Sequence, residues 1–234
     1  MKCHESFKEF IATSKHYNEM QDFVSKSHDL CPEPKNVFRF FSNDVSNAKC
    51  VILGMDPYPA TYKCGAMDKP IATGRSFEVA NIRFWTDKYR QTSLANIFKS
   101  LIYMKTGKIY TIEELRKKIN KDNFRYIDIH DWFDAMEEEG VIFLNATLTT
   151  LKNKSDAHSK IWEGFMDELL RYMVAVNKDL IWLIWGTKAL NRVKDIVDRK
   201  HIIYTCHPAT RVNNTFVKDC PFKKIKIMLN IFIT

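Results

Sequence analysis

Four short apolar runs dominate the pattern of hydrophobic and polar positions along this chain. They cover residues 50–54, 141–144, 180–185 and 201–206, and each is rich in β-branched or aromatic side chains. Segments of helical length separate them, so we interpret the runs as fully buried parallel strands. The pattern therefore predicts an α/β protein.

Helical spacing of apolar residues recurs before and between these runs. It marks residues 5–30 and 92–104, and Thr111, followed closely by two glutamates, has the pattern of a helix N-cap. Residues 156–176 and 188–198 are predicted to be the crossover helices that join the last three strands.

Two further segments show no clear period. Residues 57–70 contain three prolines and two tyrosines, a composition typical of a binding loop. Residues 225–233 fit a last helix or an edge strand equally well.

Length and composition predict one domain. The chain has 234 residues, is 45% hydrophobic and contains only seven glycines and seven prolines, so it can bury one substantial core. It contains no internal repeat, low-complexity tract or long linker. We expect a single domain over residues 1–234, with a helical segment over 1–47 and a motif-bearing core over 48–222.

Charge and cysteine content indicate a partner and a compartment. The 36 lysines and arginines exceed the 28 acids, and the net charge of +8 favours a polyanionic partner without establishing one. The six cysteines include no C-x-x-C pair and no zinc-finger spacing, so we expect a reducing cytoplasmic or nuclear compartment. The N-terminus is polar and the longest apolar run is far shorter than a membrane span, so we expect no membrane association.

Polar residues of the kind that perform chemistry follow three of the runs. Asp56 follows the first, Asn145 the second and His207 the fourth. The carboxyl ends of parallel strands border the ligand crevice of an open sheet, so we expect these side chains to converge, with Asp56 and His207 at the ends of neighbouring strands. An acid and an imidazole suit acid/base or electrostatic catalysis, an amide can read an amide-like edge, and Tyr58 and Phe77 can sandwich a planar ring. Each residue alone more often serves a turn or a cap; their joint placement favours a site.

Other chemistries lack their motifs. The chain has no G-x-S-x-G elbow, Walker loop or G-x-G-x-x-G, so a serine nucleophile and a nucleotide cofactor are not expected. Its seven histidines lack metal-ligand spacing, and no metal is implied.

Five segments match, in order and spacing, the motif blocks of one protein family. They are residues 51–59, 74–79, 140–149, 184–187 and 207–209. On these blocks the chain resembles the family 1 uracil-DNA glycosylases, with coverage from about residue 48 to residue 222. Ser93-Leu94 and His158 before Trp162 resemble two further blocks.

The resemblance implies a three-layer fold in which helices flank a four-stranded parallel sheet. It also implies hydrolysis, without a cofactor, of the N-glycosidic bond of a deoxyuridine flipped out of single- or double-stranded DNA. By the resemblance, Asp56 positions the attacking water and stabilises the sugar cation as an anion. Neutral His207 donates a hydrogen bond to uracil O2 as the base departs.

The resemblance also assigns four residues to the base. Asn145 would pair with O4 and N3–H of uracil, Phe77 would stack on the ring, and Tyr58 would crowd C5 and refuse the methyl group of thymine. Met55 stands at a base-binding position where the family usually has glutamine. Cytosine offers the reverse hydrogen-bond pattern to Asn145 and would leave buried polar groups unpaired.

The resemblance assigns DNA contact to Pro59, Ser93, His158, Ala209 and Arg211, and the chain departs from the family around them. Pro59 stands where the family has histidine, and Arg90-Gln91-Thr92 before Ser93 replaces a proline-rich loop. Ala157 before His158 replaces a serine, and Ala209-Thr210-Arg211 replaces Ser-Pro-Leu, so Arg211 stands at the intercalating leucine. A guanidinium plane can stack in the emptied base position or bind phosphate, so base flipping can proceed by another route.

Three interpretations remain at this point. The first is a uracil-DNA glycosylase that acts as a monomer. The second is a glycosylase of the same fold that excises a modified pyrimidine, because Arg75 and Glu78 replace less polar residues of the family beside the pocket. The third is a DNA-binding, replication-associated module with a replication protein as partner, in which catalysis is secondary.

Overall fold

The centre of the molecule is a four-stranded parallel sheet. A computed structural model describes residues 3–210, 212–225 and 231. Its strands are β5 (Val141–Asn145), β2 (Cys50–Gly54), β7 (Ile181–Trp185) and β8 (Ile202–Thr205), hydrogen-bonded in that order and all parallel. The predicted α/β fold and all four predicted strands are confirmed. The fourth strand begins one residue late because a 3-10 turn, Arg199–His201, precedes it.

Both faces of the sheet are apolar, which explains why the strands read as continuous hydrophobic runs. Val51 and Leu53 of β2 belong to one core cluster, whereas Cys50 and Ile52 belong to the other. All four side chains are 0% exposed. Successive side chains of a strand point to opposite faces, so each face must be covered by helices.

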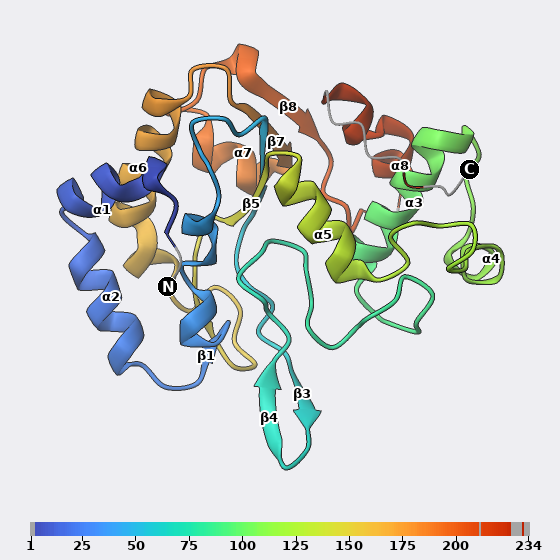
Figure 1. Ribbon diagram of the computed structural model, residues 1–234, viewed down its shortest axis with the longest axis horizontal. Helices are drawn as coiled ribbons and strands as arrows, with labels where there is room; N and C mark the ends of the chain where they lie inside the picture. The colour runs from blue at the N-terminus through green and yellow to red at the C-terminus, as the bar shows by residue number, and fades with distance from the viewer. Residues whose placement is uncertain (1–2, 211, 226–230, 232–234) are drawn as a thin grey trace.

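Two groups of helices supply that cover (Figure 1). The first cluster contains buried residues of α1 (Lys8–Thr13), α2 (Tyr17–Lys26), α6 (Ser159–Val176) and α7 (Thr187–Val193). The second draws on a different set: α3 (Thr92–Thr106), α4 (Ile112–Lys118), α5 (Ile129–Glu138) and α8 (Thr215–Asp219).

The predicted helices are confirmed with adjusted ends. The N-terminal periodic segment is interrupted at Ser14, whose hydroxyl accepts the Tyr17 N–H and donates to Glu168. The expected cap at Thr111 is a complete capping box with Glu114. Residues 188–198 are helical only as far as Val193.

The sequence predicted an irregular loop over residues 57–70, but part of this segment is regular. They contain an antiparallel hairpin of β3 (Thr61–Cys64) and β4 (Met67–Pro70). Its side chains are mostly exposed or half-buried, so no alternation of apolar and polar residues marked it. The sequence also did not predict a second small antiparallel pair of strands, β1 (Leu30–Cys31) with β6 (Thr150–Leu151).

The remaining short helical turns lie before and after these elements. Their bounds are Glu5–Phe7, Pro34–Asn36, Arg39–Ser42 and Pro221–Lys224. Most of the undecided run 225–233 lies outside the described residues. No helix in the described ranges is long and apolar enough to cross a membrane.

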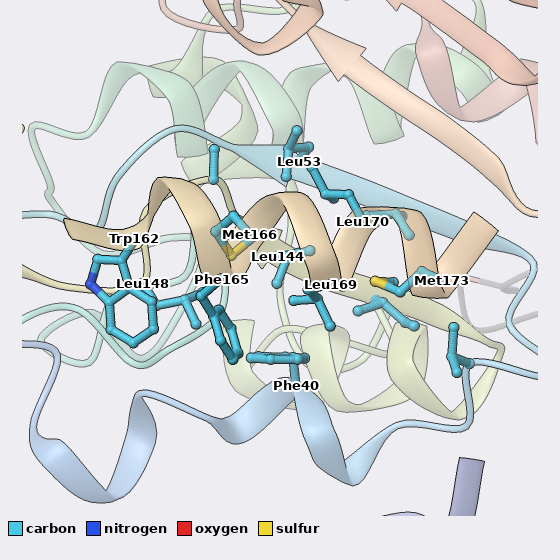
Figure 2. Packing of buried hydrophobic residues seen from close by; sticks show 14 of the residues in the cluster. Phe40, Leu53, Leu144, Leu148, Trp162, Phe165, Met166, Leu169, Leu170 and Met173 are labelled. Atoms are coloured by element: carbon cyan, nitrogen blue, oxygen red, sulfur yellow. The ribbon is translucent and has the colours of Figure 1, made fainter. Parts of the chain in front are cut away.

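Helix α6 provides much of the first core cluster. Figure 2 shows Leu169, Leu170 and Met173 of this helix beside Leu53 of β2 and Leu144 of β5. Leu170 is 0% exposed, whereas Ile161 of the same helix is 42% exposed.

We expect Leu170→Ala to lower the free energy of unfolding by about 2–5 kcal/mol, because it removes buried contacts and leaves a cavity against the sheet. Ile161→Ala on the same helix is the control and should change it by no more than about 0.5 kcal/mol. Urea denaturation followed by circular dichroism measures both. Equal effects of the two variants would show that α6 does not pack as described.

Candidate active site

A cavity of about 210 Å³ lies where β2 and β5 end. It gathers eight of the eleven residues that the sequence proposed for the site, and three more. The lining residues are Gly54, Met55, Asp56, Pro57, Tyr58, Pro59, Phe77, Ser93, Asn145, Ser155 and His207. One expectation needs correction: the strand before His207 is not the neighbour of the strand before Asp56, because β7 lies between β2 and β8.

Asn145 is the last residue of β5 and is only 4% exposed. Its amide group forms no hydrogen bond with other described residues, so both its donors and its acceptor are available to a ligand. A Cβ at Gly54 would lie 2.3 Å from Asn145 Oδ1 and 2.8 Å from Ser76 Cβ. Glycine at position 54 is therefore what allows the amide to lie flat against β2.

Asp56 lies two residues beyond the end of β2. The pairing with the neighbouring segment continues past the strands, since the Thr147 N–H donates to Met55 O over 2.8 Å. Asp56 Oδ2 accepts the Asp156 N–H at 3.1 Å. Burial raises the pKa of Asp56, while this hydrogen bond and the cation of Lys188 act in the opposite direction.

His207 faces the cavity from beyond the end of β8. Its Nδ1 accepts the Ala209 N–H at 3.1 Å, so the proton of the neutral ring is on Nε2. Desolvation lowers the pKa of His207, which favours this neutral form. Asn96 of α3 donates to Pro208 O over 2.6 Å and fixes the segment that follows the ring.

Two aromatic residues complete the walls. Phe77 has a φ of 66°, a conformation that bulky residues rarely adopt. Its ring centroid lies 4.9 Å from that of Trp185 and 6.3 Å from that of His207. Burial raises the pKa of Tyr58 to about 12, although its hydrogen bond with Ser93 has the opposite effect. The phenol is therefore neutral at physiological pH.

Arg75 and Glu78 flank Phe77 in sequence, but neither lines the cavity. Arg75 is 4% exposed and Glu78 1% exposed, and Arg75 Nη1 lies 3.0 Å from Glu78 Oε1. Arg75 also forms ion pairs with Asp134 and Glu137 of α5, and His130 Nδ1 lies 2.9 Å from Glu78 Oε1. Burial alone would raise the pKa of Glu78, but His130 and Arg75 hold it below its usual value.

The amino-acid sequence that forms this cavity matches one protein family. Residues 41–227 match the Uracil DNA glycosylase superfamily, a range that contains all the lining residues. The chain belongs to this superfamily. A uracil-DNA glycosylase of Helicobacter pylori (strain HPAG1) is 30% identical over 219 residues, which cover 93% of this chain and 83% of that protein.

Solved structures of the superfamily have the same fold. The Y322L variant of mimivirus UNG, in complex with UGI, has a TM-score of 0.64 and 26% identity over 88% of this chain and 70% of that one. UNG of Nitratifractor salsuginis has a TM-score of 0.74 over 95% of this chain and 90% of that one. At 17% identity the latter likeness concerns the fold alone.

Two described residues proposed for DNA contact, His158 and Ala209, are not part of the cavity lining. His158 is 7% exposed, and its Nδ1 lies 3.0 Å from Thr149 Oγ1, which also accepts the Trp162 Nε1–H. Ala209 is exposed and serves His207 through its backbone N–H. Arg211 lies outside the described residues.

The sequence did not single out Ser155, Asp156 or Lys188. Ser155 lines the cavity, and all three line an adjoining groove of about 380 Å³ that also contains Asp56. Lys188 comes three residues after β7. Ligands bind outside the carboxyl ends of parallel strands, so this position could have been predicted from the sequence. Ser155 and Asp156 reach the groove from the loop before α6, which sequence alone does not place.

We expect Arg75→Met to lower the free energy of unfolding by about 3–5 kcal/mol, because it leaves the buried Glu78 carboxylate without its main cation. Arg83→Ala removes an ion pair to Asp128 in which the arginine side chain is 73% exposed. That control should cost no more than about 1 kcal/mol. Urea denaturation compares them, and a mild effect of Arg75→Met would contradict the role given to this network.

Proposed function

We propose that the protein hydrolyses the N-glycosidic bond of deoxyuridine in DNA and leaves an abasic site, as the first step of base excision repair. The observation that carries the proposal is the buried, unpaired amide of Asn145, held in one cavity with Asp56 and His207. An amide offers one donor and one acceptor side by side, which is the complement of the O4 and N3–H edge of uracil.

The aromatic residues supply shape. Phe77 is braced by Trp185 at one wall of the cavity, where a flipped base can stack on it. Tyr58 closes another wall, where it excludes a substituent at C5. Thymine differs from uracil only by a methyl group there, so a rigid wall can reject it sterically.

The catalytic residues act on charge. As the bond breaks, the sugar becomes cationic and the leaving uracil anionic. The carboxylate of Asp56 stabilises the sugar and orients a water molecule, while Nε2–H of His207 donates to uracil O2. A preorganised donor of this kind is worth about 2.7–4 kcal/mol to the transition state. Because the imidazole is neutral, the enzyme does not have to bury a second charge.

The alternatives lose their support in the structure. The interpretation as a glycosylase for a modified pyrimidine depends on Arg75 and Glu78 lying beside the pocket, but both contact α5 instead. A module with secondary catalysis would not need the acid, amide and imidazole to share one cavity.

We propose that the protein acts as a monomer on DNA. The described residues carry no observation in favour of a replication partner.

The decisive assay presents the purified protein with oligonucleotides that carry one U, T, C or 5-methylcytosine in the same sequence, in excess chelator. We expect release of uracil alone, and loss of turnover by orders of magnitude in Asp56→Asn.

Asn145→Asp should raise excision of cytosine at least about tenfold, because a carboxyl group can accept a hydrogen bond from the N4 amine of cytosine. Faster release of 5-methylcytosine than of uracil by the wild type would overturn the proposal.

The rate should fall in acid, since protonation removes the anion of Asp56. Burial raises the pKa of Asp56 and Lys188 opposes that rise, so loss of Lys188 must raise the pKa further. We therefore expect Lys188→Ala to move the acid limb of the single-turnover rate to higher pH at saturating enzyme. Lys194→Ala, directly after the same helix, should leave the limb in place. An unmoved limb in Lys188→Ala would show that this lysine does not act on Asp56.

A further inference from the structure

The hairpin of β3 and β4, residues 61–70, is called here the hairpin arm, and its base lies directly beside the pocket wall. Its first strand begins two residues after Pro59, which lines the cavity. The Ile71 N–H donates to Ala60 O over 3.0 Å and closes the base, and the Asn153 N–H donates to Pro59 O over 2.8 Å. Figure 1 shows the hairpin arm projecting from the body of the molecule. The pocket thus fixes where the arm points.

The hairpin arm is slender. Its register runs from Thr61 opposite Pro70 to Cys64 opposite Met67, a rise of about 10 Å at roughly 3.4 Å per residue. At the tip, Gly65 has a φ of 61°, and a Cβ added there would meet no other atom within 4 Å. A groove of B-DNA is about 7.5–8.5 Å deep, so an arm of this length reaches its floor.

The tip carries an apolar side chain that the fold does not use. Met67 is 61% exposed, and among the large hydrophobic residues in the described ranges only Val212, at 63%, exceeds it. Proteins that bind the minor groove of DNA frequently insert an apolar side chain, such as methionine, leucine or phenylalanine, between base steps. An exposed methionine at the end of a narrow projection beside a base-binding pocket suits that use.

The flanks of the hairpin arm carry positive charge. Lys69 has no ion-pair partner among the described residues, whereas Lys63 pairs with Asp68 across the strands at 3.0 Å. Both members of that pair are exposed, so water screens it and a phosphate can compete for the lysine. Two lysines against one acid favour a polyanion over a basic partner.

We infer that the hairpin arm binds the DNA duplex beside the flipped nucleotide, with Met67 in a groove and Lys63 and Lys69 toward phosphates. The inference rests on the proposed function for the identity of the ligand as DNA. A second copy of the chain is a weaker occupant, because charged residues along β3 and β4 disfavour pairing of these edges with another strand. Single-stranded DNA has no groove, so the contribution of Met67 is specific to duplex substrates.

The test compares kcat and KM of Met67→Ala and Lys69→Ala on one uracil-containing sequence in single- and double-stranded form. We expect Met67→Ala to raise KM several-fold on the duplex, with kcat unchanged and little effect on the single strand. Lys69→Ala should reduce the slope of the logarithm of duplex affinity against the logarithm of salt concentration by about one, as loss of one phosphate contact does.

Matched controls lie beyond the opposite end of the sheet. Val176→Ala removes an exposed apolar side chain and Lys178→Ala an exposed cation, near the amino end of β7. Neither should change KM or the salt slope. If Met67→Ala and Lys69→Ala behave like these controls, or if Met67→Ala weakens both substrates equally, the inference is wrong.

Two further outcomes separate the hairpin arm from the proposed function. A wild type that excises no uracil refutes the function, and the arm is then tested by fluorescence anisotropy with the same duplex lacking uracil, where Met67→Ala and Lys69→Ala must still bind more weakly than the controls. Self-association of the wild type in sedimentation that Met67→Ala abolishes would assign the arm to a second copy and overturn the inference.

Discussion

The close approach of three chain segments around Gly54 is the constraint on which the pocket depends. The end of β5 and the segment that carries Phe77 both meet β2 there, and a side chain on Gly54 would collide with Asn145 and Ser76. The contact orders the amide of Asn145 before any base enters. A polar group that is already in place costs no reorganisation during the reaction, which is why such groups dominate catalysis in closed sites.

The Phe77 segment needs support because its backbone is strained. A bulky residue at positive φ costs about 1–3 kcal/mol and persists only where the surroundings fix it. Ser76 Oγ donates to Ile52 O over 3.0 Å and connects the segment to β2, and Arg75 connects it to α5. Buried ion pairs contribute little net stability, so we interpret this one as selecting a single conformation of the segment. Helix α5 thereby takes part in shaping a cavity that it does not line.

Much of this arrangement could be predicted because its signals are local. The apolar runs identified the sheet, and the polar residues after them identified Asp56, Asn145 and His207. The order of strands could not be read in the same way, since nothing in the runs shows that β7 separates β2 from β8. The direction of Arg75 is set by partners about 60 residues away in sequence, Asp134 and Glu137, and the hairpin arm has no buried face to give it a pattern.

The base pocket and the surface that would contact DNA are under different physical demands. Reading a base requires donors and acceptors fixed within a fraction of an ångström, so few residues can replace Asn145 or His207. Phosphates attract any cation within reach, and grooves accept many apolar side chains, so these contacts can move to new elements. Pro59 contributes no polar side-chain group to the cavity wall, and the hairpin arm begins two residues later. The DNA contact that we infer for the arm would therefore start from a segment that also forms the pocket wall.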